Sequence, residues 1–214
     1  MKKVLLLGDS IRMGYDKYVK ESFSEVAEVY YPRENCKFAQ YTLRYLAAWK
    51  KELGWPGDID LVHWNVGLWD VGEIDGDAPL SSIEHYMDMI RRIDKRLRVL
   101  FPHAKMVFAT TTAVREEGYK GKFRRHNAVI EQFNAAALSV LGETDTVINY
   151  LYEHTKNIAP EYCSDMTHYN TPAGAAYMGG KVLAAICPLL GVSPNEVKAQ
   201  GFELEKYSAS NIGM

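Results

Sequence analysis

Residues 4–10 read VLLLGDS, four consecutive aliphatic residues followed by a glycine, an aspartate and a serine. The apolar run is short and continuous, which is typical of a strand buried on both faces. The glycine indicates a turn at the end of that strand. The segment therefore predicts a buried strand whose carboxyl end leads into a loop that presents the hydroxyl of Ser10.

A second informative cluster lies near the other end of the chain. Residues 165–168 read DMTH, which places Asp165 and His168 three positions apart in a polar, turn-prone stretch. Nucleophilic acyl transfer needs an attacking hydroxyl, a base that takes its proton and an acid that orients the base. Serines follow strands in many loops, and the Asp-x-x-His spacing is common by chance. The combination of the two clusters is what indicates catalysis.

The composition is that of an ordinary globular protein. The chain has 214 residues, 47% hydrophobic and 24% charged, with a formal net charge of −2. A chain of this length can bury its own core without disulfides or metal. The net charge gives no reason to expect nucleic acid or another polyanion as partner. The basic run at residues 120–125 is interpreted as a solvated loop and the start of a helix.

Cysteine usage and apolar runs exclude several further classes. The three cysteines are odd in number and widely spaced, and no His, Asp or Glu cluster has metal-ligand spacing, so we expect no disulfide framework, metal or cofactor. A secretory apolar region needs about seven to fifteen residues, and a membrane span about 18. No stretch approaches either length, which predicts a cytoplasmic protein without a membrane partner. A leader removed beforehand would leave secretion open.

Short strand-like runs alternate with helical patterns along the chain. The runs cover residues 3–8, 26–31, 59–66, 105–112 and 146–149, of which the last is the weakest. Helical spacing of apolar residues appears at 83–100, at 123–141, around 43–47 and after Thr171-Pro172. This alternation predicts one domain over residues 1–214, an α/β protein with a mainly parallel five-stranded sheet in a three-layer α/β/α sandwich. The last 20 residues or so are expected to form a peripheral extension.

The candidate site residues follow the predicted strands. In open parallel sheets, ligands bind outside the carboxyl ends of the strands. Ser10 follows the first strand, residues 65–70 follow the third, and residues 110–112 close the fourth. The loop of residues 165–168 precedes the last helix. The chemistry and the topology therefore point to the same edge of the sheet.

These motifs resemble those of the GDSL-type, or SGNH, hydrolase superfamily of esterases and lipases, and the resemblance extends over essentially the whole domain. Gly8-Asp9-Ser10 resembles the nucleophile motif near the N-terminus, and Asp165-Met166-Thr167-His168 resembles the last motif. The third motif, Gly-x-Asn-Asp, is present in altered form as Gly67-Leu68-Trp69-Asp70, and the glycine-bearing second motif is not evident. The resemblance implies a flavodoxin-like fold and an ester hydrolase that uses no cofactor.

The resemblance also implies a role for each residue of the triad. Ser10 would be the nucleophile, and His168 would be the general base that later returns a proton to the leaving alcohol. Asp165 would hold the imidazole in the required tautomer. The alternatives for the single residues are a turn or helix-cap serine at Ser10 and a surface histidine at position 168.

An oxyanion hole needs two or three donors. By the family pattern, the Ser10 backbone N–H is the first. The region after the second strand suggests the backbone of Cys36, or of its neighbour Asn35, as the second. Trp69 occupies the position of the family asparagine, so Asn65 is the nearest amide that could be the third donor. Asn65 is equally well explained as a polar residue that terminates a buried strand.

Three further residues are expected to support the site. Asp9 is predicted to tie the nucleophile turn to neighbouring backbone N–H groups, and Asp70 to brace the loop after the third strand. Gly67 belongs to the altered third motif in the same loop.

The substrate is indicated mainly by residues 64–70. Their sequence, WNVGLWD, is similar to a variant third motif in carbohydrate-type members of the superfamily, which remove acetyl groups from sugars. This favours a small-acyl, acetyl ester, with an acylated carbohydrate as the small-molecule partner. Trp55, Trp64 and Trp69 could stack on sugar rings or serve ordinary packing. The oligomeric state is not predicted.

Three alternatives remain open. One is a lipase-, lysophospholipase- or thioesterase-type member of the same superfamily. Another is a degenerate member that binds a carbohydrate or a partner without turnover, because the second motif is missing and Trp69 replaces an asparagine. The third is a flavodoxin-like domain that binds a nucleotide or cofactor.

Overall fold

The computed structural model describes residues 1–197 of the chain, so the predicted C-terminal extension lies almost wholly outside the described residues. At its centre is an entirely parallel five-stranded sheet with the order β2-β1-β3-β5-β7. Its strands are β1 (Lys2–Leu7), β2 (Ala27–Tyr30), β3 (Leu61–Trp64), β5 (Lys105–Ala109) and β7 (Val147–Asn149). All five coincide with predicted runs, and the strand order is flavodoxin-like. The predicted fold class is therefore confirmed.

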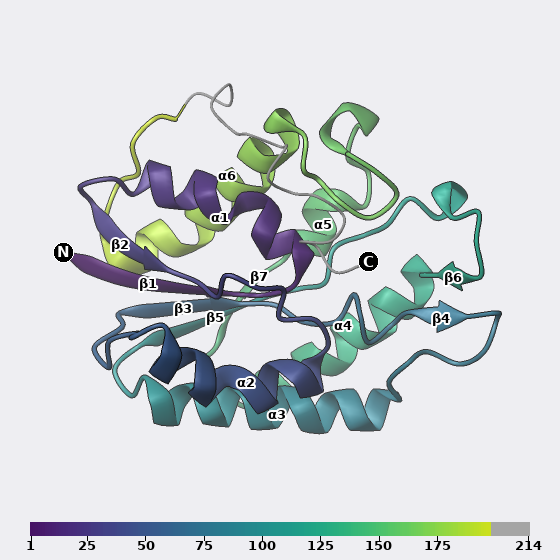
Figure 1. The fold of residues 1–214 in the computed structure, drawn as a ribbon, viewed down its shortest axis with the longest axis horizontal. Helices are drawn as coiled ribbons and strands as arrows, with labels where there is room; N and C mark the ends of the chain where they lie inside the picture. The colour runs from purple at the N-terminus through teal and green to yellow at the C-terminus, as the bar shows by residue number, and fades with distance from the viewer. Residues whose placement is uncertain (198–214) are drawn as a thin grey trace.

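Helices cover both faces of the sheet, as Figure 1 shows. Helices α1 and α6 pack together over one face with α5 nearby, and α2, α3 and α4 cover the other. Their bounds are α1 (Ser10–Ser22), α2 (Ala39–Glu52), α3 (Ile83–Leu100), α4 (Asn127–Leu141), α5 (Leu151–Thr155) and α6 (Pro172–Leu190). Two 3₁₀ helices, η1 (Glu116–Gly118) and η2 (Pro160–Tyr162), lie in connecting segments.

The structure departs from the sequence prediction in three helical regions, one of which is the short helix α5, over which no helix was predicted. No helix was predicted over α1, whose inner face buries the polar Arg12 and Asp16 and so lacks a clear apolar stripe. The helix expected from residue 123 begins only at Asn127, because Phe123–Arg124 forms strand β6. This strand pairs antiparallel with β4 (Glu73–Ile74) beyond the carboxyl ends of the sheet strands (Figure 1).

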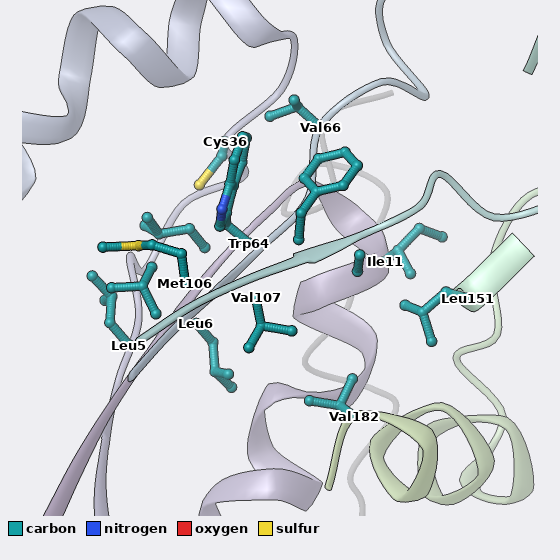
Figure 2. Packing of buried hydrophobic residues seen from close by; sticks show 14 of the residues in the cluster. Leu5, Leu6, Ile11, Cys36, Trp64, Val66, Met106, Val107, Leu151 and Val182 are labelled. Atoms are coloured by element: carbon teal, nitrogen blue, oxygen red, sulfur yellow. The ribbon is translucent and has the colours of Figure 1, made fainter. Parts of the chain in front are cut away.

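The core lies on both sides of the sheet. Residues 4–7 of β1 are fully buried, which accounts for their continuous apolar sequence. Figure 2 shows side chains of β1 and β5 beside Trp64 of β3, with Ile11 of α1 and Val182 of α6 on the face of the sheet that these two helices cover. The Trp64 ring lies edge-on to Phe108 at a centroid distance of 4.7 Å. Trp64 and Trp55 are both buried, so they serve packing.

Gly8 allows an unusually close contact at the end of β1. A Cβ atom at this position would lie 2.0 Å from Oδ1 of Asn65 and 2.7 Å from Cβ of Arg12. A side chain would therefore force apart the end of β3 and the first turn of α1. The glycine lets the Asn65 side chain pack directly against the turn that carries Ser10.

Helix α6 corrects one expectation. By length and apolar composition it could span a membrane, although no such segment was expected. About half of the helix is buried inside the structure, where α6 packs against α1. Its apolar character is that of a core helix. Thr171 caps the helix by accepting a hydrogen bond from the Gly174 N–H at 2.9 Å, as the Thr-Pro pair predicted.

Candidate active site

The sharp turn after β1 positions Ser10 as the first residue of α1. Asp9 is the N-cap of this helix, and its Oδ1 accepts a hydrogen bond from the Ile11 N–H at 3.0 Å. A carboxylate at this position also interacts favourably with the positive end of the helix. The hydroxyl of Ser10 is thereby fixed at the carboxyl edge of the sheet.

The segment from Asp165 to His168 is a tight turn held by local hydrogen bonds. Oδ1 of Asp165 accepts from the backbone N–H groups of Thr167 at 2.6 Å and His168 at 2.8 Å. The Ser164 N–H donates to the carbonyl oxygen of His168 at 2.9 Å and closes the loop. These bonds use one oxygen of Asp165 and leave Oδ2 to face the imidazole.

Folding brings the two distant motifs into direct contact. Oγ of Ser10 lies 2.8 Å from Nε2 of His168, although the residues are 158 positions apart. Nδ1 of His168 lies 2.7 Å from Oδ2 of Asp165. These three groups form a continuous hydroxyl–imidazole–carboxylate chain. It can take the proton from the serine as the serine attacks an electrophile.

The environment of Asp165 keeps its carboxyl group ionised. Partial burial alone would raise the pKa of Asp165, but the hydrogen bond and positive charge of His168 and the two backbone N–H groups outweigh this effect. Together they lower the pKa of Asp165 to about 2. The group is therefore an anion at any pH above about 4, as a residue that orients and stabilises an imidazolium must be.

Asp9 and Asn65 form a buried polar contact next to the turn that carries Ser10. Nδ2 of Asn65 donates to Oδ1 of Asp9 at 3.1 Å. Within the described part of the chain, Oδ2 of Asp9 and Oδ1 of Asn65 are buried without a hydrogen-bond partner. Burial is the main influence on Asp9 and raises its pKa, against the lowering effect of the Ile11 and Asn65 hydrogen bonds.

The geometry does not support the oxyanion role expected for Cys36. Its backbone N–H donates to the carbonyl oxygen of Gly8 at 3.1 Å, so this donor is already used to fasten the loop after β2 to the nucleophile turn. The thiol is fully buried, and burial raises its pKa to about 11. Such a thiol is an inert packing group.

Arg12 fastens the same loop and was not singled out from the sequence. Its guanidinium is buried, forms an ion pair with Asp16 at 2.6 Å, and donates to the carbonyl oxygens of Pro32 and Glu34. The pair holds the segment after β2 against the first turns of α1. A basic residue in that helix gives no sign in the sequence that it is buried, because lysines and arginines are usually exposed.

The loop after β3 contains the expected supporting residues. Asp70 is fully buried and accepts hydrogen bonds from the Ala39 N–H at 3.1 Å and the Ser81 hydroxyl at 2.9 Å. It thus braces the loop against α2, and burial raises its pKa to about 7. Gly67 has φ of 139°, a conformation that L side chains rarely adopt.

A cavity of about 430 Å³ opens beside the Ser10 hydroxyl. Its lining residues are Ser10, Trp69, Tyr119, Lys120, Gly121, Phe123, Arg125, Met166, Thr167 and His168. Arg125 belongs to the basic run that was interpreted as solvated. It is instead half-buried, and its Nε donates to the carbonyl oxygen of Leu68. Only the pairing of β4 with β6 brings this run over the site, so no local sequence signal could have shown it.

Neither Asn65 nor Cys36 lines this cavity. The triad residues Ser10 and His168 do, which makes the cavity the natural place for a molecule that reacts with the serine. Among residues 1–197, no group of three or more His, Cys, Asp or Glu side chains is placed to hold a metal ion.

Comparisons with known proteins identify the fold. No protein-family model matches the chain, and no curated protein matches its sequence. A lipase/acylhydrolase from Enterococcus faecalis is 16% identical with a TM-score of 0.68, covering 92% of this chain and 100% of its own. A GDSL-like lipase from Bacteroides thetaiotaomicron is 17% identical with a TM-score of 0.64, covering 86% and 87%. An acetyl xylan esterase is 16% identical with a TM-score of 0.64, covering 86% and 99%. The chain therefore has the fold of GDSL-like lipases and acylhydrolases, in agreement with its motifs.

Proposed function

We propose that this chain is a serine ester hydrolase that works through an acyl-enzyme intermediate. The observation that carries the proposal is the hydrogen-bonded chain from Oγ of Ser10 through His168 to Asp165, at 2.8 and 2.7 Å, beside an open cavity. Nucleophile, base and orienting acid are within hydrogen-bond reach of one another, which is the arrangement that activates a serine hydroxyl. The shared fold of lipases and acylhydrolases supports the same conclusion.

The reaction follows from this geometry. Oγ of Ser10 attacks the ester carbonyl carbon, and its proton passes to Nε2 of His168. The tetrahedral oxyanion collapses, the carbon–oxygen bond to the alcohol breaks, and His168 returns the proton to the departing alcohol. A water molecule then attacks the acyl-serine as His168 takes one of its protons. Collapse releases the acid and restores the Ser10 hydroxyl, while Asp165 stabilises the imidazolium in both halves.

The oxyanion requires donors that are fixed in place. We assign the backbone N–H of Ser10, since the first N–H groups of a helix have no acceptor within the helix. The Asn65 amide donates to Asp9 and does not line the cavity, so we assign it to the support of the turn that carries Ser10 and not to the oxyanion.

A small acyl group on a carbohydrate is the proposed substrate. A cavity of about 430 Å³ lies in the range of small-molecule sites, about 300–1,000 Å³. Trp69, Tyr119 and Phe123 contribute aromatic rings to its lining, and such rings can pack on the apolar faces of sugars. The acetyl xylan esterase among the proteins of similar fold has a name consistent with this substrate class.

The test uses p-nitrophenyl acetate as substrate and Ser10→Ala as the informative variant. We expect the wild type to release p-nitrophenol and Ser10→Ala to lose about 10³-fold or more of kcat. Ser22→Ala is the matched control, because Ser22 lies in the same helix and its buried hydroxyl has no hydrogen-bond partner within residues 1–197. Equal activity of Ser10→Ala and wild type would refute the mechanism and favour a binding protein without turnover.

The acyl preference is tested separately with p-nitrophenyl acetate and p-nitrophenyl octanoate. We expect a higher kcat/KM for the acetate, and release of acetate from an acetylated oligosaccharide. A clear preference for the octanoate would contradict the small-acyl assignment and would favour the lipase-type alternative.

A further inference from the structure

The surroundings of Arg125 differ from those of Arg12, which is buried, and of Arg98, which is half-buried. Arg12 forms an ion pair with Asp16 at 2.6 Å, and Arg98 forms ion pairs with Asp94 at 2.7 Å and Asp145 at 2.6 Å. Arg125 is half-buried, yet within residues 1–197 no carboxylate lies within ion-pair distance of it. Its charge is therefore not neutralised by a direct partner in the described part of the protein.

Among the described residues, only neutral groups bind the Arg125 guanidinium. Nε donates to the carbonyl oxygen of Leu68, and Nη1 lies 3.4 Å from the hydroxyl of Tyr119 and 3.5 Å from that of Thr167. The guanidinium also lies over the ring of Phe123, 4.7 Å from its centroid. Nη2 has no hydrogen-bond partner among the described residues. The guanidinium is thus oriented through Nε and Nη1, and the N–H groups of Nη2 can donate to a bound molecule.

Burying a cation without a counter-ion is unfavourable, and a contact with an aromatic ring compensates for it only in part. Asp9 is the carboxylate that interacts with Arg125 at longer range, and this attraction lowers the pKa of Asp9. Asp9 does not line the cavity, however, and burial has the larger, opposite effect on its pKa. An anion in the cavity would satisfy Arg125 directly.

The rest of the cavity is suited to an anion of this kind. Its lining contains a second cation, Lys120, and no aspartate or glutamate. Ser10 and His168 belong to the same lining, so a molecule that reaches Arg125 can also reach the nucleophile. A planar guanidinium binds a carboxylate through two parallel hydrogen bonds, which gives geometric as well as electrostatic selectivity.

We propose that Arg125 is a specificity-determining residue that binds a carboxylate of the substrate, so that the enzyme acts on esters of acidic molecules, such as an acetylated sugar that carries a carboxylate. This proposal rests on the proposed function, because it assigns the substrate class of the Ser10 site. The carboxylate could belong to the alcohol or to the acyl part of the ester, and the substrates below separate these two sources.

The test compares substrates with and without a carboxylate, and follows how the variants change their ratio. On the alcohol side, 4-acetoxybenzoate is paired with its neutral methyl ester; on the acyl side, p-nitrophenyl hemisuccinate is paired with p-nitrophenyl butyrate. The measured quantity is the ratio of kcat/KM for the anionic over the neutral substrate. We expect Arg125→Gln to lower this ratio about tenfold or more in at least one pair, mainly through KM, as for a lost charge-assisted hydrogen bond.

Two further variants make the result specific. Arg125→Lys keeps the charge without the planar fork and should keep part of the preference. Arg124→Gln removes a neighbouring exposed arginine of β6 and should leave the ratio unchanged. If Arg125→Gln changes the ratio no more than Arg124→Gln in both pairs, the proposal is overturned.

A binding measurement separates this proposal from the catalytic one. Binding of 4-acetoxybenzoate to Ser10→Ala is compared with binding to Ser10→Ala/Arg125→Gln by titration calorimetry. Weaker binding to the double variant supports the carboxylate site even if Ser10 proves not to be a nucleophile. Equal binding of 4-acetoxybenzoate, and of monomethyl succinate as the acyl-side ligand, to both proteins overturns the carboxylate site, and it does so whether or not Ser10→Ala abolishes turnover.

Discussion

The side-chain amide of Asn65 donates a hydrogen bond of 3.1 Å to the carboxylate of Asp9, so that the residue after β3 supports the N-cap of the helix that begins with Ser10. Both side chains are almost fully buried. The bond joins two segments of the chain 56 positions apart at the point where the nucleophile turn must be rigid. Its removal should affect both the stability of the fold and the placement of the serine.

Asn65→Ala leaves the buried carboxylate of Asp9 with one hydrogen bond fewer. We expect the free energy of unfolding to fall by about 1–3 kcal/mol, the usual cost of a buried group left unsatisfied. Urea unfolding followed by circular dichroism measures the change. Asn157→Ala is the matched control, since Asn157 is exposed and should alter stability by less than about 0.5 kcal/mol. Equal effects of the two substitutions would contradict the structural role of the Asn65–Asp9 bond.

Asp165→Asn should abolish most of the activity while the protein stays folded. The asparagine oxygen can still accept from the N–H groups of Thr167 and His168, so its NH₂ group would face Nδ1 of His168. Nδ1 would then have to be an acceptor, which moves the ring proton to Nε2, where it blocks proton transfer from Ser10. We expect kcat to fall about 10³–10⁴-fold.

The control for this prediction is Asp77→Asn, an exposed aspartate in the loop before α3. Hydrolysis of p-nitrophenyl acetate is the measurement, and a thermal melt confirms that both variants fold. An Asp165→Asn protein within tenfold of wild-type kcat would show that the carboxylate does not set the tautomer of His168.

The stability of the protein should fall as the pH rises from about 4 to 7 because of Asp70. Burial raises the pKa of Asp70 to about 7, well above the value near 4 of an unfolded chain. In this window the folded state holds a proton that the unfolded state has lost, so raising the pH favours unfolding. The effect is about 2–4 kcal/mol over the window. Above the folded pKa of Asp70 both states have lost the proton, so the pH dependence ends there and the lost stability is not regained.

Asp70→Asn cannot titrate and should flatten this part of the profile. Urea unfolding of wild type and variant at pH 4, 5, 6 and 7 measures the difference, which removes contributions from other buried carboxyl groups. Asp145→Asn, at an exposed position, should leave the slope unchanged. Asp165 acts at lower pH, because its depressed pKa means that its contribution is lost only as the pH falls toward about 2. Parallel wild-type and Asp70→Asn profiles would refute the assignment.

Gly67→Ala and Gly180→Ala should change stability in opposite directions. At Gly67 the backbone has φ of 139°, and a Cβ atom would lie 2.2 Å from Oγ1 of Thr111. We expect a loss of about 2 kcal/mol or more from strain and overlap. At Gly180, inside α6, a Cβ atom meets nothing within 4 Å, and alanine should add about 0.5–1 kcal/mol through helix propensity. Thermal or urea unfolding of both proteins checks the pair, and a tolerated Gly67→Ala would contradict the observed backbone.

Elements with a strong local pattern were predictable from the sequence. Helix α3 was expected over the residues it occupies, and Thr171-Pro172 marked the start of α6, because periodicity and capping depend on neighbours within one or two turns. Helix α1 was not predicted, because its inner face buries the Arg12–Asp16 pair in place of apolar residues. For the short strand β6 the sequence predicts the start of a helix, because only its pairing with β4 makes it a strand.

The candidate site was also predictable from the sequence only in part. The turn that holds Asp165 and His168 depends on hydrogen bonds between residues at most three positions apart, so its motif can be recognised in the sequence. Two features of the site could not be predicted from the sequence. They are the hydrogen bond from the Cys36 N–H to the carbonyl oxygen of Gly8, and the half-buried position of Arg125. Both depend on which loops the sheet brings together.

By itself, the sequence determined the alternation of strands and helices, the buried first strand, and the identity of the hydroxyl, imidazole and carboxylate, because hydrophobic period and local hydrogen bonding act over short stretches of chain. The tertiary structure alone decided that Ser10 meets His168 across 158 positions, and that a cation with no carboxylate partner among the described residues lies beside them. Contacts of this kind follow from the order in which parallel strands assemble, which places remote loops at one edge of the sheet.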